Sequence, residues 1–255
     1  EMSASLLLGL LIAGRASFGV KVAGWCLLAF LASGVFLSNS RGGIAGLTIG
    51  ALTVLLLSIL TLENRAHGHT MMRRLIVAAS SFGLVAVIVV SSVVLIGGDQ
   101  LVDRFESVGK ELKDNNNERI NRVEIWRSAM QLVREHPVAG AGFGAFSVGV
   151  TAFDSADGGR FKLEQAHNDY LEIAAGGGVI GLAFCAAFLF NLGRSIRARL
   201  SHATAISRAA SIGATGGIAA VLVHSFFDFG LHAGVNAAVF TMLSVIAMAQ
   251  NRAEE

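Results

Sequence analysis

Long apolar runs with almost no charged residues constrain this chain more than any other feature of its sequence. They lie at about residues 22–37, 44–62, 75–96, 170–192, 209–227 and 235–248. A helix needs about 20 mainly apolar residues to cross the hydrocarbon core of a bilayer, and several of the runs reach that length. The pattern predicts an all-α protein, a polytopic transmembrane helix bundle with about six full spans.

Composition agrees with a membrane protein. Apolar residues make up 53% of the chain and charged residues 15%, against about 25% charged residues in a soluble domain. The net charge of +2 is scattered along the chain, so no basic patch points to a nucleic acid. Cys26 and Cys185 lie in apolar runs, which favours packing over a disulfide.

The first residues resemble the end of a span that has already begun. Leu6 to Ile12 are apolar and are soon followed by Arg15. We therefore expect a partial first span, and we expect residues 1–255 to form a single membrane domain, the C-terminal part of a longer protein.

Residues 99–164 have a different composition. They contain nine Lys or Arg and eleven Asp or Glu, so we predict a water-exposed loop at residues 98–169 that carries amphipathic helices. One helix is expected from Asn117 to Glu135, because an apolar stripe recurs there at helical spacing. Its members are Val123, Trp126, Met130 and Val133.

Trp126 could anchor this helix in the membrane interface. His136–Pro137 is expected to end the helix, since a residue before proline disfavours the helical conformation. Gly140 to Gly144 then predict a flexible turn. It is not expected to bind a nucleotide, because no Gly-Lys-Ser/Thr follows.

The short loops predict the orientation. Basic residues gather in the links at 63–74 and 193–208, and short cytoplasmic loops carry excess Lys and Arg. The turn at Arg41, the segment 99–169 and the link near Asp228 would then face outward.

The residues from Gln165 to Glu172 combine a histidine, an amide and two carboxylates just before an apolar run. His167 is the candidate base, because imidazole titrates near neutral pH. Asp169 or Glu172 could orient it. Alternatively, Asn168 and Asp169 cap the helix that begins near Tyr170.

Two arginines are further candidates. Arg41 lies where a span meets the outer surface, beside serines and glycines that suit an anion. The alternative is a snorkelling side chain at a helix end. Arg122 lies one helical turn before Trp126, and its alternative is a solvated helix face.

His224, Asp228 and His232 stand four residues apart, a spacing that imitates metal ligands on a helix. Gly230 is expected to break such a helix, so a lining role at the outer ends of the spans is preferred to a metal site.

Five short motifs in order carry a resemblance. They are SRGG at 40–43, RVEIW at 122–126, HPVAGAGFG at 136–144, HNDYL at 167–171 and HSFFD at 224–228. Over about residues 35–245 the chain resembles the O-antigen ligase and polymerase superfamily of bacterial inner-membrane proteins. The resemblance implies a glycosyltransferase-C-like fold surrounded by membrane lipids.

The resemblance also implies the reaction. On the periplasmic face, a glycan on undecaprenyl diphosphate would move to an acceptor hydroxyl of a lipid A core sugar or of another glycan. Arg41 and Arg122 would hold the diphosphate, and His167 would act as the base or orient the acceptor. The other candidate substrate-binding residues are Asn168, Asp169, Trp126, His224 and Asp228. No cofactor and no metal is expected, because the lipid-linked donor is already activated.

Attack opposite the diphosphate would invert the anomeric configuration. Ligase and polymerase differ only in the acceptor, and nothing in these residues distinguishes the two. A transporter of lipid-linked sugars is a rival, but transporters place ionisable groups near the bilayer midplane. Here these groups cluster at the outer ends of spans. A non-catalytic export partner is a third possibility, and it would tolerate the loss of His167.

Overall fold

The computed structural model describes residues 1–14, 16–38, 40–62, 122–153, 163–202 and 204–249, and every regular element in these ranges is helical. The all-α prediction is thus confirmed for the described part of the chain. The predicted span at 75–96, the basic link at 63–74 and residues 98–121 and 154–162 of the predicted outer loop lie outside the described residues.

Four helices among the described residues are long and apolar enough to cross a membrane. They are α2 (Phe18–Leu37), α3 (Arg41–Leu62), α8 (Asp169–His202) and α9 (Ala205–His224). The partial first run forms α1 (Met2–Ala13), and the last run forms the 15-residue helix α10 (Gly234–Met248). The described part therefore contains four such helices, against the six predicted for the whole chain.

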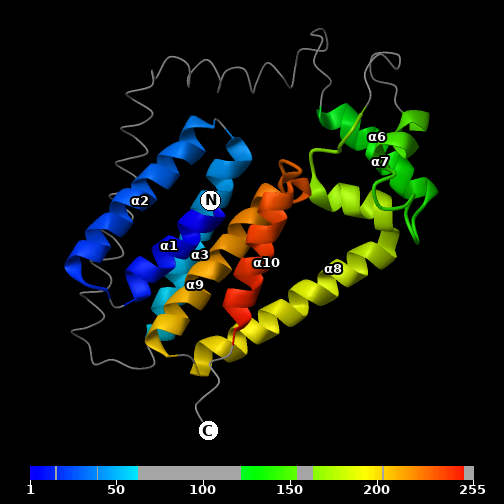
Figure 1. Ribbon diagram of the computed structural model, residues 1–255. Coiled ribbons are helices and arrows are strands. Elements are labelled where there is room, and N and C mark those ends of the chain that lie inside the picture. Colours follow the sequence, from blue (N-terminus) through cyan, green and yellow to red (C-terminus); the bar gives the residue numbers. More distant parts are fainter. Residues whose placement is uncertain (15, 39, 63–121, 154–162, 203, 250–255) are drawn as a thin grey trace.

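Helix α9 lies at the centre of the bundle, with α1 and α3 on one side and α10 on the other (Figure 1). Small residues bring the backbones of α1, α3 and α9 together. Gly213 of α9 faces Gly9 of α1, and Gly216 of α9 faces Gly50 of α3, so closely that an added Cβ would overlap the opposite backbone. Helices in membranes associate in this way, because small side chains permit close packing.

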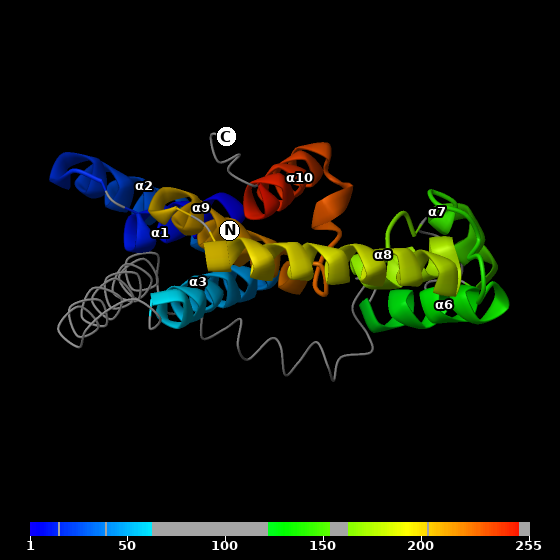
Figure 2. The ribbon, with the colours of Figure 1, turned by 90° about the horizontal axis from the view of Figure 1, so that it is seen from below.

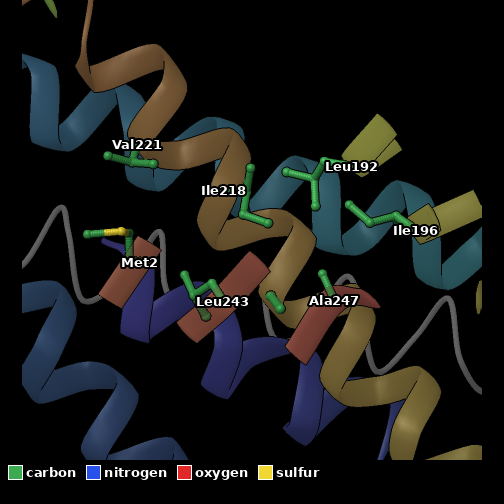
Figure 3. Close-up of a cluster of buried hydrophobic side chains, with 8 residues drawn as sticks. Met2, Leu192, Ile196, Ile218, Val221, Leu243 and Ala247 are labelled. Carbon is green, nitrogen blue, oxygen red and sulfur yellow. The ribbon is translucent and has the colours of Figure 1, made fainter. Parts of the chain in front are cut away.

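A second group of buried side chains joins α9 to α1, α8 and α10 (Figure 3). Its eight members are Met2, Leu192, Ile196, Ala214, Ile218, Val221, Leu243 and Ala247. This cluster attaches the far end of α8 to the bundle, so the beginning of α8 is held at a defined place relative to the end of α9.

Helix α8 is longer than its apolar run. Residues 193–202 continue the helix, so Arg194, Arg197 and Arg199 lie on α8, and the link to α9 is only residues 203–204. The prediction of a basic link at 193–208 was wrong in this respect. The stretch contains no proline, and arginine is a good helix former.

Helix α8 is also interrupted at Gly178, where φ is 59° and ψ is −155°. A short first part, residues 169–177, therefore stands at an angle to the long remainder (Figure 1). The sequence analysis expected one continuous span here. Three consecutive glycines at 176–178 were the available signal.

The helices α6 (Arg122–Glu135) and α7 (Phe146–Gly149) and the 3₁₀ turn η2 (Val150–Phe153) cover the first part of α8. Figure 2 shows α6 and α7 at the end of α8 remote from α2. Helix α6 ends before Pro137, as predicted. Residues 117–121, where this helix was predicted to begin, lie outside the described part.

The face of α6 that packs against the protein is not its apolar stripe. The buried residues of α6 are Ile125, Ser128, Ala129 and Leu132. Val123, Trp126 and Met130 are exposed. Ile125, Ala129 and Leu132 of this face share a buried cluster with Phe146 and Ala175, and the Ser128 hydroxyl donates to the Phe153 carbonyl at 3.0 Å. The spacing of large apolar residues could not predict that a face with small residues would pack against the protein.

Candidate functional site

The turn that follows α9 is bonded to the first turn of α8. The Asp169 backbone N–H donates to the Ser225 carbonyl at 2.9 Å, and the Ser225 hydroxyl donates to Asp169 Oδ2 at 2.7 Å. Both side chains are buried. The beginning of α3 lies beside them, since Ser40 Oγ is 3.3 Å from the His224 ring. We call this end of the bundle, marked by Arg41, Asp169 and Ser225, the site end.

His167 faces Asp228 across this junction. Its Nδ1 lies 3.4 Å from Asp228 Oδ1, and both side chains remain about 40% exposed. The same Oδ1 accepts the backbone N–H of Phe229 at 2.9 Å, and the Phe229 ring packs edge-on against the imidazole at 4.9 Å. The expectation that Asp169 or Glu172 orients His167 was wrong, because both carboxylates contact a different histidine.

His167 has a left-handed backbone, with φ of 51°. Residues other than glycine avoid this conformation, which costs on the order of 1 kcal/mol or more and persists only where the surrounding structure enforces it. With Nδ1 directed at Asp228, the ring places its N–H there and leaves Nε2 as a proton acceptor. The arrangement holds a partly exposed base in one orientation.

Asn168 is the helix cap. Its Oδ1 accepts the Leu171 N–H at 3.0 Å, and its Nδ2 donates to the Phe226 carbonyl at 3.3 Å. Of the two capping candidates, the structure thus selects Asn168. Asp169 does not cap, since its carboxylate is directed at Ser225 and at residues 231–232.

His232 lies between two carboxylates. Its Nδ1 is 3.0 Å from Asp169 Oδ1, and its Nε2 is 3.2 Å from Glu172 Oε1. The other Glu172 oxygen accepts the N–H of Ala166 at 3.2 Å. His232 was predicted to lie near the site, but its partner Asp169 could not be predicted because it is 63 positions away in the sequence.

His224 is the last residue of α9 and is half-buried. Its Nδ1 lies 2.9 Å from Glu1 Oε1, and its Nε2 lies 3.3 Å from Ser40 Oγ. Burial by itself raises the pKa of the Glu1 carboxyl, but the His224 hydrogen bond and nearby positive charge outweigh it, so this pKa is lowered. His224 therefore contacts protein groups on both sides of its ring.

The three residues His224, Asp228 and His232 straddle a turn, as expected, because α9 ends at His224 and a 3₁₀ turn, η4 (Gly230–His232), follows. Each of the three has a different partner. Within the described ranges, no group of three or more His, Cys, Asp or Glu side chains is arranged to hold a metal ion.

Arg41 is the first residue of α3 and is exposed. The predicted glycine-rich turn is instead the first turn of this helix, and Ser40 Oγ accepts the Gly43 N–H at 3.0 Å. Gly42 packs against His224 and Phe227, since a Cβ at Gly42 would lie 2.5 Å from Cδ2 of the His224 ring and 3.0 Å from Phe227 Cβ. Arg41 thus lies at the site end, at the N-terminus of a helix, where anions are favoured.

Arg122 is the first described residue of α6 and is also exposed. One turn later, the Trp126 indole N–H donates to the Ala166 carbonyl at 2.9 Å. This bond brings the beginning of α6 to the residue that precedes His167. It also gives Trp126 a structural role that the expected interface anchor did not include.

The segment after α6 completes the break in α8. The N–H of Val179 donates to the Pro137 carbonyl at 2.9 Å, and the N–H of Ala141 donates to the Ala175 carbonyl at 2.8 Å. Backbone N–H and C=O groups at a helix end or break lack partners within the helix, and burying them without a hydrogen bond is costly. The predicted flexible turn is therefore hydrogen-bonded to α8 on both sides of Gly178, and these bonds fix the angle between the two parts of α8.

A family model described as O-antigen ligase matches residues 26–186. The matched segment contains the motifs at 40–43, 122–126, 136–144 and 167–171, whereas the motif at 224–228 lies beyond it. A comparison with curated protein sequences gives no match.

Proposed function

The chain belongs to the O-antigen ligase family, as its motifs predicted, and we propose that it transfers a glycan from undecaprenyl diphosphate to an acceptor hydroxyl. The family covers ligases and polymerases, which are membrane enzymes of the glycosyltransferase type that use lipid-linked glycans. We assign the ligase reaction first, with the polymerase as the alternative.

The orientation of His167 carries the proposal. Nδ1 is directed at Asp228, 3.4 Å away, so Nε2 is the atom that takes the acceptor proton. The acceptor oxygen bonds to the anomeric carbon, and the bond between that carbon and the diphosphate oxygen breaks. The electron pair leaves with undecaprenyl diphosphate. Hydrogen bonds between catalytic groups are often long before substrate binds, so 3.4 Å suits this role.

Arg41 and Arg122 are proposed to bind the diphosphate. Each is exposed; Arg41 is the first residue of α3, and Arg122 is the first described residue of α6. A guanidinium donates paired hydrogen bonds to phosphate oxygens, and the α3 N-terminus adds partial positive charge at Arg41. Both effects stabilise the charge that develops as the diphosphate leaves. On this chemistry the step needs no metal.

The distribution of charge supports a periplasmic site in the bacterial inner membrane. Helices α8 and α9 carry Arg194, Arg197, Arg199 and Arg208 at the end opposite Asp169 and Ser225. Basic residues at span ends favour the cytoplasmic side. The site end would then face the periplasm, where the lipid-linked donor and the lipid A core acceptor would meet it.

The backbone of His167 suggests the sharpest test. Asparagine tolerates left-handed backbone better than alanine does, so His167→Asn should fold while lacking the base. We expect His167→Asn in the full-length protein to lose transfer from undecaprenyl-diphosphate glycan to lipid A core. General-base catalysis is worth about 10²- to 10⁴-fold. His136→Asn is the control, because His136 is an exposed histidine in the turn after α6.

Unchanged transfer by His167→Asn at matched expression would remove His167 from the chemical step. It would also restore the transporter and export-partner alternatives. NMR of the product provides a second check, since attack opposite the diphosphate predicts an inverted anomeric centre. Transfer to lipid A core identifies a ligase, and glycan extension without that acceptor identifies a polymerase.

A further inference from the structure

Both ring nitrogens of His232 face carboxylate oxygens, at 3.0 Å from Asp169 and 3.2 Å from Glu172. A neutral imidazole carries one N–H, and only the doubly protonated ring donates on both sides. The Asp169 side chain is 3% exposed and that of Glu172 is 12% exposed. A cation between two shielded carboxylates satisfies groups whose burial would otherwise be costly.

The Asp169 carboxylate contacts the turn that carries Asp228 at residues before and after Asp228. Before Asp228, the Ser225 hydroxyl donates to Asp169 Oδ2 at 2.7 Å. After Asp228, the Leu231 N–H lies 3.4 Å from the same oxygen, and His232 contacts Oδ1. The position of the Asp228 carboxylate therefore depends on how firmly this turn is attached to α8.

Glu172 extends the connection to the residue before His167. One of its oxygens contacts His232, and the other accepts the N–H of Ala166 at 3.2 Å. His167 thus lies between Ala166, which is connected to His232 through the Glu172 carboxylate, and Asp169, whose own carboxylate contacts His232.

We propose that His232, in its doubly protonated form, is a positioning residue that holds Asp228 against His167, so that glycan transfer depends on the proton it carries. This inference rests on the proposed function. Asp228 and His232 lie beyond the segment that the family model matches, whereas His167, Asp169 and Glu172 lie within it. His232 is not proposed to touch the substrate.

The charged groups around His232 set the direction of the pH effect. Helix α8 presents Asp169 and Glu172, and the turn itself presents the Phe229 ring at 6.5 Å. Helix α10, which packs on η4, contains no charged residue, and Asn236 donates to the Gly230 carbonyl. On α9 the nearest titratable group along the chain is His224, which is paired with Glu1.

Loss of the His232 proton would therefore leave one carboxylate without its donor and loosen the turn. Activity should fall at alkaline pH if the ring then carries only one of its two N–H donors. The opposite limb of the pH profile belongs to His167, which must be neutral to act as a base. The two histidines then produce a bell-shaped profile.

The test compares two variants of the full-length protein over about pH 5 to pH 9, a range that brackets the ordinary histidine titration. His232→Arg retains two or more donors and a permanent charge. It should keep transfer within roughly threefold of wild type and lose the alkaline fall. His232→Gln cannot bridge two carboxylates with a charge, and its kcat should drop roughly tenfold with little change in donor KM. His136→Gln is the matched control.

Nitrogen NMR of protein labelled with ¹⁵N-histidine tests the inference without any transfer reaction. The His232 ring should show two protonated nitrogens at neutral pH, and its signal should disappear in His232→Arg. The His167 ring signal, assigned with His167→Asn, should shift in His232→Gln and not in His136→Gln.

The outcomes separate the two proposals. A neutral His232 ring at neutral pH, or a His167 signal that ignores His232→Gln, would overturn the positioning role whatever the activity. An alkaline fall that persists in His232→Arg would also overturn it. If wild type transfers no glycan while both NMR results hold, the positioning of His167 stands and the proposed reaction fails.

Discussion

The Ser225 hydroxyl donates to the Asp169 carboxylate at 2.7 Å, and this bond joins the turn after α9 to the beginning of α8. Asp169 is buried, and a hydrogen bond to a buried charged group is worth about 1.5–3 kcal/mol. Ser225→Ala should therefore lower the free energy of unfolding by about that amount. The expected observation is a lower apparent Tm of the full-length protein in detergent.

Ser244→Ala is the matched control for Ser225→Ala. Ser244 is also buried, but its hydroxyl donates to the Phe240 carbonyl of its own helix at 2.9 Å. That carbonyl keeps its helical partner when the hydroxyl is removed, so the effect should be small. Equal Tm losses in the two variants would argue against a special role of the Asp169 bond.

The break in α8 predicts a contrast between two glycines of the same helix. Gly178 has φ of 59°, and a Cβ there would overlap the Val138 carbonyl. Gly178→Ala should cost roughly 1–3 kcal/mol from backbone strain alone. Gly193 has no atom near its missing Cβ, so Gly193→Ala should be neutral or stabilise by up to about 1 kcal/mol. Thermal unfolding of both variants measures the contrast, and a neutral Gly178→Ala would contradict the geometry.

Lysine should substitute only partly for the two proposed phosphate-binding arginines. It offers a point charge rather than a planar fork, so Arg41→Lys and Arg122→Lys should raise the donor KM on the order of tenfold, as expected for one lost charge-assisted hydrogen bond. Arg134→Lys, on the exposed last turn of α6, is the control. Full activity of both lysine variants would argue against bidentate hydrogen bonds between these arginines and the diphosphate.

Trp126 was expected to contact substrate or the membrane interface, whereas its indole N–H donates to the Ala166 carbonyl. Trp126→Phe keeps most of the apolar surface and removes that donor. We expect a loss of about 0.5–1.5 kcal/mol in stability and an unchanged donor KM. The comparison is Met130→Leu, an exposed apolar position on the same helix. A raised KM with unchanged stability would restore the substrate-binding role.

Local sequence was sufficient for the helices and for the kinds of chemistry at the site. The apolar length of a span and the stop at Pro137 are properties of neighbouring residues, so α2, α3, α6 and α9 could be predicted to within a few residues where they are described. His167 could be singled out because imidazole has few structural reasons to stand before a membrane helix.

Partner choice was decided only by the tertiary structure. His167 stands within five residues of Asp169 and Glu172, yet its partner Asp228 is 61 positions away. Helix packing brings the turn after α9 against the first turn of α8, and it gives the two nearer carboxylates to His232. The same packing selects the buried face of α6. Such pairings depend on contacts between helices distant in sequence, and no local spacing encodes them.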